Sequence, residues 1–272
     1  MTLLALDAPT LAARPADPLD PARHVVAFMA ALAVPALIAY GFDDRLLHGV
    51  SVWSKPLKFQ AALGLHFATL LILAPLLSAE ARRSRTLRWS MLAAATMAVL
   101  EIAYMTLQAA RGRASHFNVE TMPEQLAYSL MGVGATVIVV GSFLFGWLVW
   151  RSRPAMADGR DGLRLGAALG LMAGSVLTLA IGGYLGSQTS HWIGGDLTDA
   201  TGLPISGWST TGGDLRPAHF LATHMMQVLP VLGLVADRLR LPAIGLWIAT
   251  ALYTALTFAV AAQAVMGLAL FG

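Results

Sequence analysis

Seven long apolar stretches, separated by short polar segments, occupy most of the 272-residue chain. Each stretch is close to the roughly 20 residues that an α-helix needs to cross the hydrocarbon core of a bilayer. Charged residues make up only 12% of the chain, about half the share that is typical of soluble domains. The pattern predicts an all-α, polytopic integral membrane protein whose seven transmembrane helices lie near residues 24–41, 57–79, 89–109, 126–150, 163–186, 218–236 and 243–270.

Residues 1–23 hold several Pro, Asp and Arg residues, unlike the basic stub and short apolar core of a cleavable signal. We expect them to stay attached as a cytoplasmic tail, and residues 24–272 to form a single transmembrane domain with an outer loop at 187–216. Lys and Arg are twice as frequent in the segments on the side of this tail as in the opposite segments. The positive-inside rule therefore predicts that the N-terminus faces in and the C-terminus faces out.

The composition excludes several classes of site. There are no cysteines, which rules out disulfides, thiolate zinc sites, iron–sulfur clusters and covalently attached c-type haem. The net charge of +3 reflects the basic residues of the predicted inner loops, and no basic patch interleaved with aromatic residues indicates a nucleic-acid partner. Phosphate-binding and dinucleotide-binding glycine motifs are also absent from the sequence.

Small residues recur at every fourth position of the fifth predicted helix. Such a ladder allows the backbone of a neighbouring helix to approach closely. It predicts that this helix packs at the centre of the bundle, or that a homo-oligomer forms through the face of Gly166, Gly170 and Gly174.

Three ionisable side chains lie near the middle of predicted spans, namely His66, Glu101 and His224. Because ionisable groups are costly in hydrocarbon, each is a candidate for function. Glu101 begins a polar stripe at helical spacing that continues through Tyr104 and Gln108 toward the outer surface. We predict that these three residues are catalytic; the alternative is that Glu101 is a protonated, hydrogen-bonded strut between helices.

Two histidines mark the sixth predicted helix. His219 and His224 are five residues apart, about 140° around a helix, so they cannot readily bind one ion as an i, i+4 pair does. They are expected to belong to two layers. The alternative for His219 is an interfacial side chain that hydrogen-bonds the loop, and the alternative for His66 is a hydrogen bond between helices.

A deep layer of polar residues is predicted to hold a divalent transition metal, to face a b-type haem, or to relay protons. Imidazole and carboxylate suit several transition metals, although no HExxH-like spacing identifies the ion. This layer contains His66, Glu101, His224 and Gln227.

An outer layer of basic and polar residues is predicted to bind a lipophilic or anionic small molecule from the outer side. The Gly-rich segment before the sixth helix is expected to fold over the mouth of the bundle. The layer contains Lys55, Lys58, Arg111, His116, Asn118, His191, Asp214 and His219.

Four strings carry a resemblance: KPLKF, RGRASHFN, GWSTTGGDLR and HFLATHMMQ. Together they make the chain from Lys55 to Pro230 resemble a family of uncharacterised bacterial multi-pass membrane proteins. The resemblance implies a location in the bacterial cytoplasmic (inner) membrane, with the motifs on the outer side. It implies no activity, substrate or cofactor.

The buried residues leave three functional interpretations open. In the first, the protein is a metal- or haem-dependent membrane enzyme or redox protein that acts on a lipophilic or amphiphilic molecule; Glu101 is its acid–base group, and Arg111 and Lys58 bind an anion. In the second, it is a proton-coupled small-molecule transporter. In the third, it is a non-catalytic sensor or assembly factor whose outer loops bind a partner.

Overall fold

The computed structural model describes residues 17–152 and 161–272. Seven of the helices in these residues are long and apolar enough to cross a membrane, which confirms the predicted all-α architecture and the number of long apolar helices. They are α1 (Asp20–Phe42), α2 (Ser54–Leu73, continued by a 3₁₀ turn, Ala74–Leu76), α4 (Arg85–Ala110), α5 (Met122–Arg151), α6 (Asp161–Gly186), α7 (Arg216–Leu239) and α8 (Ile244–Val265).

The ends of these helices follow local sequence signals. The hydroxyl groups of Ser84 and Thr121 cap α4 and α5 by accepting hydrogen bonds from backbone N–H groups of the first turn. Pro21 lies in the first turn of α1, where its missing N–H group costs no helical hydrogen bond. Helix α1 therefore starts inside the predicted tail, most of which lies outside the described residues. The orientation of the chain in a membrane stays a prediction.

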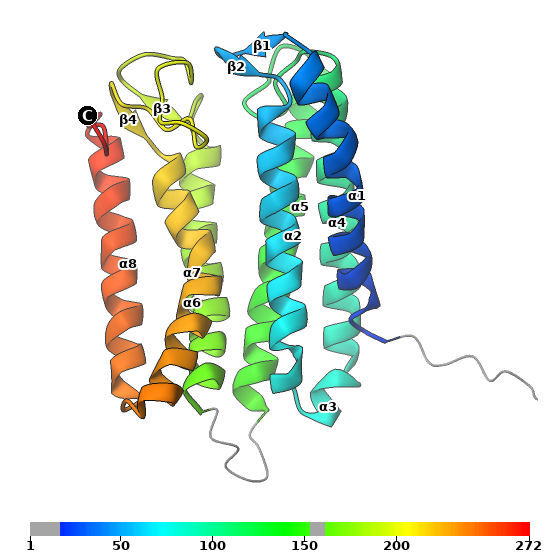
Figure 1. The fold of residues 1–272 in the computed structure, drawn as a ribbon, viewed down its shortest axis with the longest axis vertical. Helices are drawn as coiled ribbons and strands as arrows, with labels where there is room; N and C mark the ends of the chain where they lie inside the picture. The colour runs from blue at the N-terminus through cyan, green and yellow to red at the C-terminus, as the bar shows by residue number, and fades with distance from the viewer. Residues whose placement is uncertain (1–16, 153–160) are drawn as a thin grey trace, which may run out of the picture.

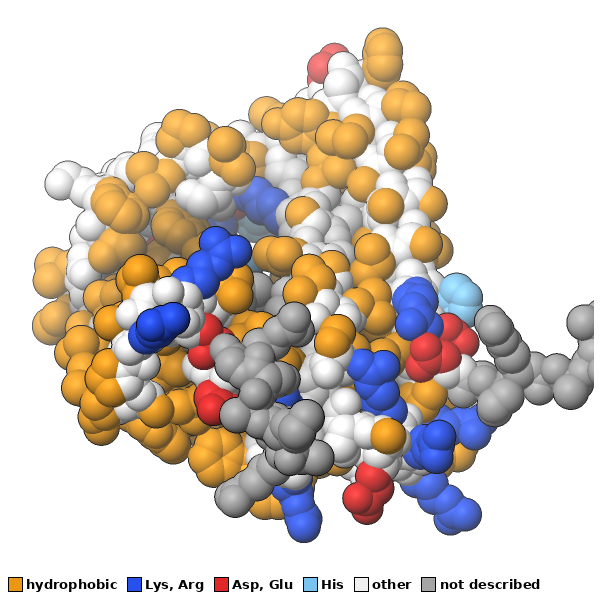
Figure 2. Space-filling view, turned by 60° about the horizontal axis from the view of Figure 1, so that its bottom comes forward, with side chains coloured by type: hydrophobic (Ala, Val, Ile, Leu, Met, Phe, Trp, Pro, Cys, Tyr) orange, Lys and Arg blue, Asp and Glu red, His pale blue; other side chains and the backbone are white. Residues whose placement is uncertain are grey.

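The spans form two groups of helices (Figure 1). Helices α1, α2, α4 and α5 pack together in one group, and α6, α7 and α8 in the other; α5 joins the groups by packing against α6. Helices α2 and α7 lie next to each other without extensive backbone packing. Figure 2 shows the surface hollowed between the two groups, with a basic side chain inside the hollow.

The connections between the helices lie at the two ends of the bundle. At one end, α3 (Ala79–Arg82) links α2 to α4, and Figure 2 shows that this end carries many Lys and Arg side chains. We call it the basic end. The opposite end carries two small antiparallel hairpins, in which β1 (Leu46–Leu47) pairs with β2 (Val50–Ser51) and β3 (Trp192–Ile193) pairs with β4 (Gly213–Asp214).

Helices α6 and α7 are packed backbone against backbone. A Cβ atom at Gly166 would collide with the carbonyl group of Leu229, and one at Gly170 would come within 2.8 Å of the carbonyl oxygen of Met225. The glycine ladder is thus buried against α7 of the same chain. Helix α7 of the same chain therefore occupies the face of α6 that was predicted to form a homo-oligomer. The homo-oligomer itself stays a prediction.

We expect Gly166→Ala to lower the thermal midpoint of the detergent-solubilised protein. The added methyl group meets rigid backbone, and overpacking of this kind costs about 1–3 kcal/mol. Gly183→Ala is the matched control, because a Cβ atom there has no neighbour within 4 Å and alanine favours the helix. Equal midpoints for the two variants would show that the close contact between α6 and α7 does not limit stability.

Candidate functional site

Polar side chains of α2 and α7 meet along the strip where the two groups of helices face each other. The amide of Gln227 donates a hydrogen bond to the hydroxyl of Thr69 at 3.4 Å. His66 and His224 lie within electrostatic range of each other, as do His224 and His219. We call this strip the α2–α7 seam; it is lined by Lys55, Lys58, His66, Thr69, His219, His224 and Gln227.

At its deep end the seam reaches α5. Nε2 of His66 lies 2.9 Å from Oγ of Ser142, and that hydroxyl group also bonds to the carbonyl oxygen of Ile138 at 3.1 Å. A hydroxyl group has one hydrogen, so with Ser142 donating to the carbonyl group, Nε2 of His66 carries the proton and Nδ1 is the acceptor. Beyond Thr69 and Gln227, α2 and α7 carry no polar side chain for two turns, and the adjoining core includes the fully buried Phe67 and Phe145.

Glu101 lies on α4, which packs against α2. Its side chain is buried, and its carboxyl group has no hydrogen-bond partner in residues 17–152 and 161–272. Lys55 lies within electrostatic range of Glu101, although no direct ion pair joins the two side chains in the part of the chain that the structure describes. A group from the predicted outer layer is therefore the electrostatic neighbour of Glu101.

His116 extends the polar region above the seam. Its ring lies 5.6 Å from that of Phe59 and 5.8 Å from that of Tyr128, measured between centroids, and its Nδ1 is 3.1 Å from the hydroxyl of Ser115. Burial, together with the nearby charge of Lys55, holds the pKa of His116 well below its usual range. The imidazole is thus neutral near pH 7, and offers a hydrogen-bond donor and an acceptor rather than a charge.

His219 has an unpaired nitrogen. Its ring packs on Gly182 of α6, where a Cβ atom would approach Nδ1 to 3.2 Å. That nitrogen is buried and has no hydrogen-bond partner among the described residues. Because buried polar atoms are nearly always hydrogen-bonded, an atom left without a partner requires an explanation, such as a bound molecule or water.

A folded loop covers the N-terminal end of α7. Arg216 donates hydrogen bonds to both carboxylate oxygens of Asp214 and of Asp199, and to the carbonyl oxygen of Gly207. The backbone N–H of Asp199 donates to the carbonyl oxygen of His48 at 2.8 Å, which ties the loop to the β1–β2 hairpin. We call the folded segment 187–215 the cap. It agrees with the expected placement of the loop over the mouth of the bundle.

The cap also contacts α2, and it contains His191. Lys58 donates a hydrogen bond through Nζ to the carbonyl oxygen of Ser206 at 2.9 Å. Nε2 of His191 lies 3.8 Å from Oδ1 of Asp199, which is an electrostatic contact rather than a hydrogen bond. Burial lowers the pKa of His191, although the contact with Asp199 opposes this shift. Lys58 and His191 thus serve the closed cap as well as the mouth of the seam.

Other predicted site residues form a separate network at the end of α4. The amide nitrogen of Gln108 donates to the hydroxyl of Tyr104 and to the carbonyl oxygen of Ala114, and its amide oxygen accepts a bond from Arg111 at 2.9 Å. Asn118 donates to the same carbonyl oxygen. These bonds hold the 111–121 loop on α4, which is a structural task for Gln108, Arg111 and Asn118.

The predicted metal ligands do not converge. In residues 17–152 and 161–272, no group of three or more His, Cys, Asp or Glu side chains is close enough to hold a metal ion. His66 bonds through Nε2 to Ser142, whereas Gln227 bonds to Thr69. The donors therefore do not fit the expected divalent metal, and the structure gives no support to a haem held by His66 and His224.

Sequence reasoning missed two residues that complete this region. Asp199 shares Arg216 with Asp214, and Ser142 is the partner of His66. Nothing in the sequence distinguishes Asp199 from the other acidic residues of the loop, or Ser142 from a serine that bonds only within its own helix. The chain matches no protein-family model, no curated protein and no solved structure. The family resemblance stays a prediction.

The cap is expected to loosen in acid. Burial disfavours the charge of Asp199, but His191 and Arg216 outweigh it and lower the pKa of this carboxyl to about 2. A carboxyl group with a depressed pKa stabilises the folded state above its unfolded value near 3.8 and loses that contribution as the pH falls toward 2. The shift corresponds to about 2 kcal/mol.

Hydrogen exchange of the cap amides, corrected for intrinsic rates, should therefore rise between pH 4 and pH 2. Asp199→Asn should exchange rapidly already at pH 6 and show no such transition. Asp196→Asn is the matched control in the same loop, because Asp196 is exposed. A transition that persists unchanged in Asp199→Asn would assign it to another group.

Proposed function

We propose that this protein binds an amphiphilic small molecule with an anionic group in the α2–α7 seam, and exchanges protons with it there. One observation carries the proposal: basic and neutral polar side chains from α2, α4, α7 and the 111–121 loop gather in the outer half of an apolar bundle, and His219 keeps an unpaired nitrogen there. A ligand supplies the missing hydrogen-bond partner and the missing counter-charge.

The charge of the seam favours an anion. The charges near Lys55 are those of Lys58, Glu101, Arg216 and Asp199. Because Arg216 and Asp199 compensate each other, two lysines face one carboxyl group. Asp199 is already bonded to Arg216. An incoming carboxylate or phosphate is attracted to Lys55 and meets neutral imidazoles that can donate hydrogen bonds.

The surroundings of the seam favour an amphiphile over a fully polar ligand. Leu65 on α2 and Phe220 on α7 are about half exposed on the sides of the seam, where a membrane would present acyl chains. The ring of Phe220 also stacks on His224, with 4.1 Å between centroids. An apolar tail can therefore lie between the two helices while its polar head reaches the imidazoles and Lys55.

The arrangement supports proton transfer as the chemistry of the site. Glu101 and Lys55 form a carboxyl–amine pair within electrostatic range of each other, and the imidazoles of His66 and His224 can each accept or donate a proton. Helices α2 and α7 carry no polar side chain for two turns beyond Thr69 and Gln227, which supports a site reached from the outer end or from the outer leaflet. Binding with proton exchange is the step that enzymatic turnover and proton-coupled transport have in common.

Binding is expected to depend on Lys55. A fluorescent long-chain carboxylate should bind detergent-purified protein at least tenfold more tightly than its methyl ester, since a charge-assisted hydrogen bond contributes about 1.5–3 kcal/mol. Lys55→Gln should remove this preference, whereas Arg238→Gln at the basic end should keep it. If Lys55→Gln binds the acid and the ester with the same preference as the parent protein, Lys55 is not the anion site.

The proton on Glu101 should respond to the ligand. An anion bound at Lys55 raises the affinity of a neighbouring carboxyl group for protons, so infrared difference spectra should gain a band of a protonated carboxylic acid when the carboxylate binds. The band should disappear in Glu101→Gln and persist in Glu80→Gln, because Glu80 is exposed in α3. If Glu101 is only a strut, binding leaves the spectrum unchanged and Glu101→Gln lowers stability instead.

A further inference from the structure

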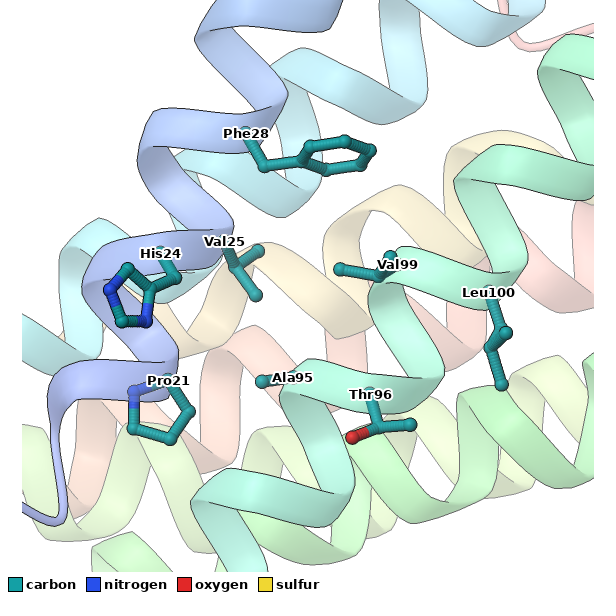
Figure 3. Close-up of a pocket in the computed structure, with 8 residues that line it drawn as sticks. All are labelled: Pro21, His24, Val25, Phe28, Ala95, Thr96, Val99 and Leu100. Atoms are coloured by element: carbon teal, nitrogen blue, oxygen red, sulfur yellow. The ribbon is translucent and has the colours of Figure 1, made fainter.

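A second site lies at the other end of the bundle, between the first turns of α1 and the middle of α4. This groove, which we call the α1–α4 groove, has a volume of about 390 Å³, within the range of roughly 300–1,000 Å³ that is typical of ligand pockets. Figure 3 shows Phe28 and Val25 of α1 facing Val99 and Ala95 of α4 across it, with His24 at its edge.

The walls of the groove are suited to a hydrocarbon chain. Val25 and Ala95 are buried and form its floor, while the rings and alkyl groups of Phe28, Val99 and Leu100 form its sides. The one hydroxyl group of the lining is that of Thr96, and it donates to the carbonyl oxygen of Leu92 at 2.9 Å. A guest in the groove therefore meets apolar surface along its walls, and the ring of His24 is the polar group at its edge.

The end of the groove nearest the basic end of the bundle carries uncompensated positive charge. Arg88 lies two helical turns before Ala95 on the same stripe of α4, about 10 Å along the helix, and Arg85 lies one turn further. Neither side chain has a hydrogen-bond or ion-pair partner in residues 17–152 and 161–272, whereas Arg23 is paired with Asp17 and Asp20. Positive charge next to an apolar groove is complementary to an anionic lipid.

We propose that the α1–α4 groove binds one phospholipid with an anionic head group, from the leaflet at the basic end. One acyl chain lies between Phe28 and Val99, and the phosphate group reaches Arg88 and Arg85, with His24 as a hydrogen-bond donor at the edge. The bound lipid replaces the mobile acyl chains of the surrounding bilayer in the groove, and it contacts both α1 and α4. This site is independent of the α2–α7 seam, which lies in the opposite half of the bundle.

The experiment uses the full chain, reconstituted in vesicles of phosphatidylcholine and phosphatidylglycerol in equal amounts, extracted in mild detergent and weighed by native mass spectrometry. The parent protein should retain one phosphatidylglycerol in preference to phosphatidylcholine. The double variant Arg85→Gln, Arg88→Gln should retain it roughly 30-fold less well, at about fivefold for each lost charge. Arg238→Gln, which removes a charge from the same end but from α7, should behave as the parent protein does.

A second variant tests the groove itself. Thr96→Trp places a large ring in the groove at an exposed position, so it should fold and yet lose both lipids from this site. Equal losses in Arg238→Gln and in the double arginine variant would overturn the proposal, as would retention of phosphatidylglycerol by Thr96→Trp. If Lys55→Gln loses the lipid and the double arginine variant keeps it, the lipid binds in the α2–α7 seam, and the proposal for the α1–α4 groove is wrong.

Discussion

The close contact between the backbones of α6 and α7 is the interaction on which the rest of the structure depends. Without a hydrophobic driving force between helices in lipid, association rests on van der Waals packing, and small residues allow the largest contact area. Here Gly166, Gly170 and Gly174 accept the backbone of α7, and Gly182 continues the ladder to the ring of His219. The same ladder that stabilises the pair therefore fixes the outer histidine of α7.

The two groups of helices are held together less uniformly. Helix α5 packs on α6 over its length, but α2 and α7 are connected mainly through side chains, such as the bond between Gln227 and Thr69. Where backbones pack closely, water and ligands are excluded; where only side chains meet, polar groups can be accommodated. His66, Thr69, His224 and Gln227 lie at the second kind of contact, which is a physical reason to locate function there.

The two ends of the bundle use opposite strategies for their charges. At the end opposite the basic end, two of the three carboxyl groups of the cap are paired, because Arg216 bonds to both Asp199 and Asp214. At the basic end Arg85 and Arg88 have no partner in the described residues. The paired charges hold the segments of the cap together. Unpaired charges at a membrane surface are instead available to lipid head groups.

The sequence by itself determined the number of long apolar helices, the helical architecture and the capacity of the α6 ladder for close packing, because these follow from hydropathy, helix length and residue size, which are local properties. It also identified His66, Glu101 and His224 as unusual, because their cost in hydrocarbon does not depend on the fold. Only the tertiary structure decided their partners: Ser142 for His66, the electrostatic neighbour Lys55 for Glu101, and Asp199 for Arg216. Those pairings depend on how each helix is rotated and which helices are neighbours, and hydropathy carries no information about either.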